Sequence, residues 1–325
     1  MNRAAALAAH APLMGVPGGA SPPGGQGDWF RGAGGLRLRA ALWTPSSLVA
    51  QTPRGTVVLS PGRTEPIEKY YETIAELQAR GFVVLVHDWR GQGLSQRLLE
   101  DRLKGHAKGF ADFVADYRAL LAQFETRLPK PWIALGHSMG GCLTLLSLAH
   151  GVKGFSAAVL SAPMLGIQTR GQPKVLARAL AWLMSRVNPT DYIMGDPGDP
   201  HGSDFTSNIV THDPVRYARN AAIFQANADL RLGGGTWGWL DFAFAASSWL
   251  KRDPGVTRID IPVLALGAEK EKLVDNADQQ RIIARIPQGR WLQVPGAYHE
   301  LLQETDAVRA VFWREFDAVT ASAAP

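Results

Sequence analysis

An apolar run that ends in a glycine-flanked serine constrains this chain more than any other feature. Residues 131–135 read Pro-Trp-Ile-Ala-Leu and lead directly into Gly136-His137-Ser138-Met139-Gly140, and the mostly apolar residues 143–149 follow with the composition of a buried helix. In the pattern G-x-S-x-G, a strand ends at a tight turn and a helix begins, which raises the serine hydroxyl above the sheet. Glycines suit this turn because larger side chains would collide with the neighbouring strand and helix. Ser138 is therefore the candidate nucleophile; the alternative is a strand-to-helix turn without chemistry.

Segments of strand and helix character alternate on both sides of this turn. Buried-strand patterns cover residues 36–43, 55–60, 82–87, 131–135, 157–161, 261–267 and 291–294, and residues 28–30 begin a hairpin with the first of them. Helical patterns cover residues 67–80, 108–128 and 306–319. Strands separated by helices at this spacing need right-handed crossovers. The sequence predicts an α/β fold with a mostly parallel central sheet and helices on both faces.

The alternation stops between residues 164 and 255. Helical patterns occur at 175–186 and 215–227, with a Gly-, Asp- and Pro-rich loop at 188–206, and no buried β run appears. Because helical insertions near the carboxyl ends of strands cover ligand pockets in α/β sheets, we expect residues 164–255 to form a cap. The predicted organisation is a flexible extension at 1–27, a core at 28–163 and 256–325, and the cap between the two core segments.

Composition limits the possible partners. The 325 residues are 46% hydrophobic, which is enough for one large domain with an insertion. The net charge of +5 comes from scattered arginines, so nucleic acid is not expected as a partner, whereas an anionic lipid surface is compatible. The single cysteine, Cys142, is expected to be a buried hydrophobe. A cytoplasmic protein is expected, either free or in peripheral contact with the inner membrane, because no run has membrane-spanning length and the alanine-rich start is a weak secretion signal.

A serine nucleophile needs a base and a carboxylate that orients the base. In α/β hydrolases these groups follow in the order serine, acid, histidine. His299 lies in Gly-Ala-Tyr-His-Glu after the last predicted strand and is the candidate base, whereas His137 and His212 are expected to be structural. The turn after residues 261–267 offers the acid: Glu271 is the first choice and Asp275 the second, with Glu269 a solvated charge.

The oxyanion formed during acyl transfer needs backbone N–H donors. One is expected from Met139, after the nucleophile, and the other from Arg63, where Gly62 lets the backbone approach the substrate. The alternative for this second segment is an ordinary Pro-Gly turn. Asp88 and Arg90, in a loop with two glycines, are expected to be structural.

Seven stretches resemble the monoglyceride-lipase branch of the serine hydrolases and, within it, the bacterial lysophospholipases associated with the inner membrane. They are Ser60-Pro61-Gly62-Arg63-Thr64-Glu65 with Lys69-Tyr70, residues 87–95, residues 136–141, Ser161-Ala162-Pro163-Met164, Val210-Thr211-His212-Asp213, residues 271–276, and Gly296-Ala297-Tyr298-His299-Glu300. The resemblance implies an α/β-hydrolase fold and hydrolysis of a fatty acyl ester in a glycerol-based lipid, without metal or cofactor. It supports Ser138 as nucleophile, His299 as base, and Arg63 and Met139 as the oxyanion hole. Most of this branch has aspartate where Glu271 stands, although its lysophospholipase-like members carry glutamate.

The substrate and the reaction stay open at this point. Met164 and Trp182 are the candidate substrate-binding residues. Five apolar residues share one face of the predicted helix 175–186, with Trp182 and Met184 beside it, and packing against the protein is favoured over a lid that contacts lipid. These five residues are Val175, Leu176, Ala179, Leu180 and Leu183. Arg216 and Arg219 could meet a phosphate head group or only water. The alternatives to a lipid or carboxyl esterase are an amide-cleaving, proline-peptidase-like enzyme, for which the acidic amine pocket is not evident, and a non-catalytic binding module.

Overall fold

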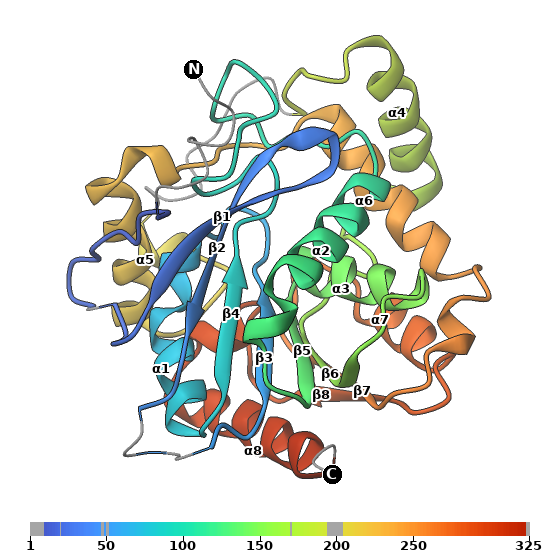
Figure 1. Cartoon of the computed structure of the whole chain (residues 1–325). Coiled ribbons are helices and arrows are strands. Elements are labelled where there is room, and N and C mark those ends of the chain that lie inside the picture. The colour runs from blue at the N-terminus through green and yellow to red at the C-terminus, as the bar shows by residue number, and fades with distance from the viewer. Residues whose placement is uncertain are drawn as a thin grey trace.

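A central sheet of eight strands organises the molecule (Figure 1). The computed structural model describes residues 10–19, 21–46, 49, 52–169, 171–193 and 204–322. The strands are β1 (Gln26–Arg31), β2 (Arg37–Trp43), β3 (Thr56–Ser60), β4 (Val83–His87), β5 (Trp132–His137), β6 (Phe155–Ser161), β7 (Val263–Ala268) and β8 (Gly289–Val294), in the order β1-β2-β4-β3-β5-β6-β7-β8. Only the β1/β2 and β2/β4 pairs among them are antiparallel. The predicted mostly parallel sheet is confirmed.

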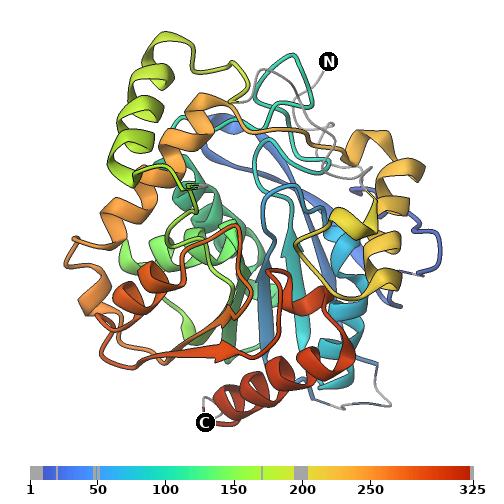
Figure 2. The ribbon, with the colours of Figure 1, turned by 180° about the vertical axis from the view of Figure 1, so that it is seen from behind.

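Helices cover both faces of this sheet (Figures 1 and 2). They are α1 (Tyr71–Ala79), α2 (Ala111–Phe124), α3 (Met139–Ala149), α4 (Lys174–Val187), α5 (Pro214–Ala226), α6 (Trp237–Leu250), α7 (Asn276–Ile283) and α8 (Asp306–Ser322). One apolar core joins the sheet to α2, α3, α6 and α7, and a second joins it to α1 and α8. Strand β3 contributes Val58 to the first core and Val57 and Leu59 to the second, because successive side chains of a strand point to opposite faces. A strand buried on both faces has to be apolar throughout, as β3 almost is.

The order of the central strands determines where a ligand site can form. The chain proceeds from β3 to β4 on one side and then returns to place β5 on the other side of β3. The loops that follow β3 and β5 therefore leave the sheet in neighbouring positions at the carboxyl ends of the strands. Such switch points in parallel sheets are where ligands bind.

The segment between β6 and β7, the predicted cap, is helical in its described part. It contains α4, α5 and α6, and α4 packs against α6. The contact face of α4 is built from small residues such as Ala181, which is buried, and Ser185, whose hydroxyl donates to the Asp241 carboxylate at 3.0 Å. Residues 194–203, within the predicted loop 188–206, lie outside the described residues.

The apolar side chains of α4 are exposed, and the expectation that they pack on the protein is wrong. Val175 is 79% exposed, Leu176 64% and Leu183 51%. Helix α4 lies at the edge of the molecule (Figure 1), and small residues such as Ala181 and Ser185 are on the side that meets α6, so its larger apolar residues are left exposed.

The N-terminal segment makes specific contacts where it is described. Ala11 is buried and pairs with the backbone of Gly27, and the carbonyl of Met14 accepts the hydroxyl of Tyr71. Residues 11–14 thus pack on the core, which differs from the mobility expected for residues 1–27; residues 1–9 lie outside the described range. None of the described helices has the length and hydropathy needed to cross a membrane.

Candidate active site

The turn between β5 and α3 carries Ser138 in a strained conformation. Its φ is 49° and its ψ −117°, in the region that side chains with a Cβ rarely adopt. Glycine is required on both sides of it, because a Cβ at Gly136 would lie 2.7 Å from the Cα of Gly141 and a Cβ at Gly140 would overlap the carbonyl oxygens of Ser60 and Pro61. Close approach of the helix to the loop after β3 is thus built into the turn. The predicted turn conformation around Ser138 is present.

Ser138, His299 and Glu271 form a continuous hydrogen-bonded chain. The His299 Nε2 lies 2.9 Å from the Ser138 Oγ, and the His299 Nδ1 lies 2.7 Å from Glu271 Oε2. The residues come from three separate segments, after β5, β8 and β7, which the parallel sheet brings to one edge. This arrangement lets the imidazole accept the serine proton while the carboxylate holds the ring.

The carboxylate of Glu271 is held in place by the turn that contains it. Its Oε1 accepts the backbone amides of Lys272 and Leu273 at 3.0 and 2.8 Å, which leaves Oε2 for His299. Burial alone would raise the pKa of Glu271, but the charge and hydrogen bond of His299 outweigh it and lower the pKa. Conversely, burial would lower the pKa of His299, and the charge of Glu271 raises it above its usual value. The pair therefore favours the charge-separated state that forms as serine loses its proton.

The other carboxylates considered for this role are engaged elsewhere. Asp275 caps α7, accepting the amide of Asp278, and pairs with Lys174. Glu269 accepts the amide of Gly296 at 2.7 Å. The structure thus places Glu271, the first of the sequence candidates, against the histidine.

The loop after β3 is fixed by two polar side chains. Glu65 accepts the amide of Gly62, and Gln92 accepts the amide of Thr64 at 2.8 Å. The amide of Arg63 lies between these two bonded amides and has no acceptor among the described residues. The amide of Met139, at the start of α3, has none there either. Two free N–H donors beside a nucleophile match what an oxyanion hole requires, and both residues stay our prediction for it.

Glu65 also anchors a buried charge network under the site. Lys69 bridges the carboxylates of Glu65 and Glu300 at 2.8 and 2.7 Å, and His137 lies 3.6 Å from Glu65. Burial would raise the pKa of Glu65, but the charge of Lys69 lowers it to about 2. Burial lowers the pKa of His137 to about 4, so its ring is neutral near pH 7. The only local sequence signal for this network is the i, i+4 spacing of Glu65 and Lys69, which permits an ion pair.

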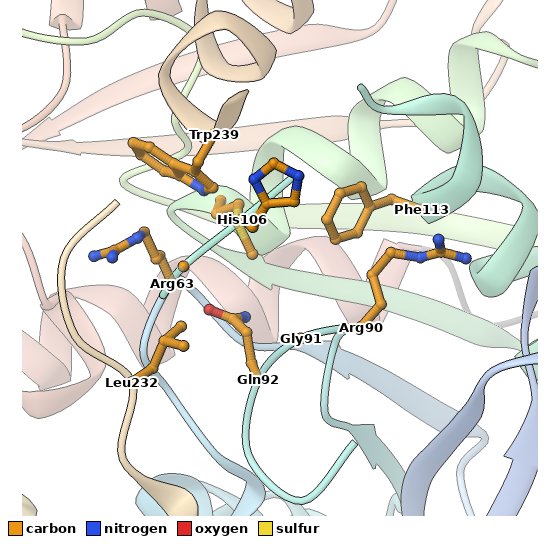
Figure 3. A pocket seen from close by; sticks show the side chains of 10 residues that line it. Arg63, Arg90, Gly91, Gln92, His106, Phe113, Leu232 and Trp239 are labelled. Atoms are coloured by element: carbon orange, nitrogen blue, oxygen red, sulfur yellow. The ribbon is translucent and has the colours of Figure 1, made fainter. Parts of the chain in front are cut away.

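A small cavity of about 10 Å³ lies beside the loop after β3 (Figure 3). Its walls come from the loop after β3, the loop after β4, the start of α3 and the predicted cap. The lining residues include Arg63, Gln92, His106, Met139 and Trp239. None of the residues that line it is acidic.

The predicted substrate-binding residues lie in different surroundings. Met164 is buried, and its amide donates to the Ser138 carbonyl at 2.9 Å, so it packs directly behind the nucleophile. Trp182 is 52% exposed on α4 with the Arg186 guanidinium over its ring at 4.1 Å, and it does not line the cavity beside Arg63. Both assignments stay predictions.

The polar residues that were expected to be structural have protein partners. Asp88 binds Arg39 at 2.7 Å, Arg90 binds Asp116 at 2.6 Å, and His212 binds Glu304 at 2.7 Å. Arg216 and Arg219, considered as phosphate contacts, both pair with Glu72. Among the described residues, no group of three or more His, Cys, Asp or Glu side chains is arranged as metal ligands.

Comparison with known proteins gives the family. The model of the family described as serine aminopeptidase, S33, matches residues 51–306. Lysophospholipase L2 of Escherichia coli strain K12 is 37% identical over 273 residues, which cover 81% of this chain and 79% of that protein. Monoacylglycerol lipase of Mycolicibacterium smegmatis is 28% identical, with 85% and 91% covered. In fold, a soluble variant of monoglyceride lipase from Saccharomyces cerevisiae in complex with a substrate analog is similar with a TM-score of 0.72 at 19% identity, over 90% of this chain and 93% of that one.

The family match, the relative at 37% identity and the fold agree with the resemblance carried by the sequence motifs. This chain belongs to the α/β-hydrolase family that includes lysophospholipase L2 and the monoglyceride lipases.

Proposed function

We propose that this protein hydrolyses the fatty acyl ester of a lysophospholipid or a monoacylglycerol through an acyl-enzyme on Ser138. The observation that carries the proposal is the hydrogen-bonded chain from Glu271 through His299 to Ser138. The relatives named lysophospholipase and monoacylglycerol lipase support the lipid substrate.

In the proposed reaction, His299 takes the Ser138 proton as Oγ attacks the ester carbonyl carbon. The negative oxygen of the tetrahedral intermediate receives hydrogen bonds from the amides of Arg63 and Met139. His299 then gives its proton to the departing glycerol oxygen as the C–O bond breaks, leaving an acyl ester on Ser138. A water molecule, deprotonated by His299, attacks this ester, and the proton returns to Ser138 as the fatty acid leaves. Glu271 stays ionised and stabilises the imidazolium in both halves.

Labelling and hydrolysis test this proposal together. The wild type is expected to react with a fluorophosphonate probe and to release fatty acid from monoacylglycerol or lysophospholipid, whereas Ser138→Ala should do neither. Circular dichroism of Ser138→Ala checks that the fold is intact. An unlabelled wild type that also cleaves no ester would favour a binding module instead.

The exposed face of α4 supports an aggregated lipid substrate. Its apolar side chains cover neighbouring positions of one helix, and a contiguous apolar patch on a basic protein suits an anionic membrane surface. We expect this face to hold the enzyme at the bilayer from which the substrate comes.

The triple variant Leu176→Ser/Leu180→Ser/Leu183→Ser should co-sediment less with phosphatidylglycerol vesicles, by about tenfold or more. Val215→Ser removes an exposed apolar residue from α5 and is the matched control; equal co-sedimentation of wild type and triple variant would contradict the assignment.

Aminopeptidase activity, which the name of the family model suggests, is less well supported. An aminopeptidase has to bind the ammonium group of its substrate, for which a carboxylate is the usual partner. The residues that line the cavity near Arg63 include arginines and no acid. We therefore expect prolyl p-nitroanilide to be cleaved far more slowly than a p-nitrophenyl ester.

A further inference from the structure

We propose that the side chain of Arg63 binds the phosphate of the substrate head group, so that this site selects lysophospholipids over neutral monoacylglycerols. The inference rests on the proposed function and narrows it to one of the two substrate classes. It assigns the side chain of Arg63 a task that is separate from that of its backbone amide.

Arg63 is partly buried and, unlike the fully buried arginines, has no carboxylate partner among the described residues. Arg39 is paired with Glu68 and Asp88 at 2.7 Å each, and Arg90 with Asp112 and Asp116. Arg216 and Arg309 are likewise paired with carboxylates. For Arg63, no ion pair with any described residue is present. A guanidinium partly removed from water without a counter-charge is destabilised, and a ligand anion would offset that cost.

The few contacts of the Arg63 side chain leave it able to accept an anion. Its Nη2 donates to the carbonyl of Gly233, and its guanidinium lies 5.0 Å from the centre of the Trp239 ring (Figure 3). The Nε is buried and has no hydrogen-bond partner. Burial lowers the pKa of Arg63 to about 10, so the group is still charged near neutral pH.

Arg97 shows that a missing carboxylate is not enough by itself. The guanidinium of Arg97 also lacks an acidic side-chain partner within hydrogen-bond distance, but it donates to the carbonyls of Gly91, Asp229 and Arg231. Those carbonyls use its donors in a structural role. Arg63 has one such bond and faces the cavity beside the candidate nucleophile's helix.

The position of Arg63 matches the chemistry of a lysophospholipid. Its backbone amide is our candidate for the oxyanion hole, so the scissile carbonyl would lie beside this residue. In a lysophospholipid the phosphate is separated from that carbonyl by only the length of a glycerol, which an arginine side chain also spans. Arginine binds phosphate oxygens with two N–H groups in a fixed geometry, whereas a free glycerol hydroxyl needs no cation.

The other polar groups of the cavity do not oppose an anion there. Gln92 is occupied by the backbone of Gly62 and Thr64, and His106 Nδ1 lies 2.9 Å from the hydroxyl of Thr236. Arg90 is held by Asp112 and Asp116, neither of which lines the cavity.

Entry of a phosphate requires the cap loop over Arg63 to shift. The cavity of about 10 Å³ holds no more than a water molecule. The loop above it contains Gly233, Gly234 and Gly235 in succession, and the Gly233 carbonyl is the present partner of the guanidinium. The loop is bonded to the backbone of Leu103, Gly105 and Ile193, so a shift has to break these bonds or carry those segments with it before a phosphate oxygen replaces the carbonyl.

The test compares two substrates in the same enzyme. The ratio of kcat/KM for a 1-acyl lysophosphatidylethanolamine to kcat/KM for the monoacylglycerol with the same acyl chain is measured in wild type and Arg63→Gln. We expect the ratio to fall by about 10- to 100-fold in Arg63→Gln, and to fall less in Arg63→Lys, which keeps the charge but not the planar fork. Arg258→Gln is the matched control, because Arg258 is exposed and precedes β7, at the opposite end of the sheet from the site.

Binding without turnover gives a second readout. The ether analogue of the lysophospholipid, which cannot be hydrolysed, competes with p-nitrophenyl butyrate, and its inhibition constant should rise about tenfold or more in Arg63→Gln relative to that of an alkylglycerol ether. An equal loss on all substrates, with an unchanged ratio of inhibition constants, would assign Arg63 only to support of the oxyanion loop. A wild type that cleaves monoacylglycerol but not lysophospholipid would overturn this inference while leaving ester hydrolysis intact; failure on both lipids would overturn both.

Discussion

His299 is placed between a carboxylate that raises its pKa and a hydroxyl that needs a neutral base. As the pH falls through the raised pKa of His299, the ring becomes protonated and can no longer accept the proton of Ser138. The acid limb of kcat/KM is therefore expected above pH 6.5, the usual value for histidine.

Glu271→Gln tests this coupling at the residue scale. Without the carboxylate, burial is the main influence left on the ring, so the pKa of His299 should fall and the acid limb should move to lower pH. The rate constant should also fall, on the order of 10³-fold, because the carboxylate that orients and stabilises the imidazolium is missing. A pH profile of kcat/KM from pH 5 to 9 measures both changes. Asp275→Asn is the comparison: if it, and not Glu271→Gln, moved the limb, the acid would be Asp275.

Candidate residues that lie in short sequence motifs could be identified from the sequence, whereas the lack of a carboxylate partner for Arg63 could not. Ser138 and His299 follow strand patterns within short glycine-containing turns, so their location at the sheet edge was predictable. Whether a charged side chain has a partner depends on segments far apart in the chain, such as Arg39 and Glu68. For Arg216 the sequence left open a phosphate contact or a solvated charge, and the structure pairs it with Glu72.

At the scale of elements, helix α3 can pack closely against the loop after β3 because Gly140 has no side chain. An added methyl group would overlap the carbonyl oxygens of Ser60 and Pro61, which belong to backbone and cannot rotate away. Ser60 and Pro61 directly precede Gly62 and Arg63, so strain at the start of α3 would be transmitted to the loop that carries the predicted oxyanion donor.

Gly140→Ala is expected to lower both stability and activity. Overpacking of this kind costs about 1 to 3 kcal/mol in the free energy of unfolding, which exceeds the gain in helix propensity from alanine. We expect kcat for p-nitrophenyl butyrate to fall tenfold or more. Urea unfolding and steady-state kinetics measure the two effects. Gly15→Ala is the control, since a Cβ there meets no atom within 4 Å; a Gly140→Ala protein with wild-type stability would show that the loop can move away freely.

The sequence predicts the elements of the core better than those of the cap. All eight strands correspond to runs that are apolar or alternate, and the parallel pairing follows from the helices between them. The outward face of α4 was misread because an apolar stripe has the same period whether it meets protein, lipid or water. Helix α6, with three tryptophans, and the short α7 were not predicted as elements, and packing against the cores decides both.

At the scale of the whole molecule, buried ionisable groups make stability depend on pH. Burial lowers the pKa of His87 to about 3 and that of His137 to about 4. Glu65 and Glu72 have pKa values of about 2: burial would raise them, but Lys69 lowers the pKa of Glu65, and arginines led by Arg216 lower that of Glu72. Each of these two histidines and two glutamates has a lower pKa in the folded protein than in the unfolded chain, so the unfolded chain binds its proton more readily.

The free energy of unfolding should therefore decrease as the pH falls, in two overlapping stages. Histidines in the unfolded chain protonate near pH 6.5, so the contribution of His87 and His137 is lost from there down to about pH 3; that of the glutamates is lost from about pH 4.5 to 2. His299 acts in the opposite sense and at higher pH, because its raised pKa adds stability as the pH falls towards 6.5 and adds no further stability below that value. Urea unfolding at pH values from 7.5 to 3.5 measures the slope.

In His87→Gln the decrease in the free energy of unfolding between pH 6.5 and 4 should be smaller than in wild type. His10→Gln, which alters an exposed histidine, should leave this decrease unchanged. Equal slopes in wild type and His87→Gln would show that His87 is protonated in the folded protein at these pH values, despite its burial against Trp89.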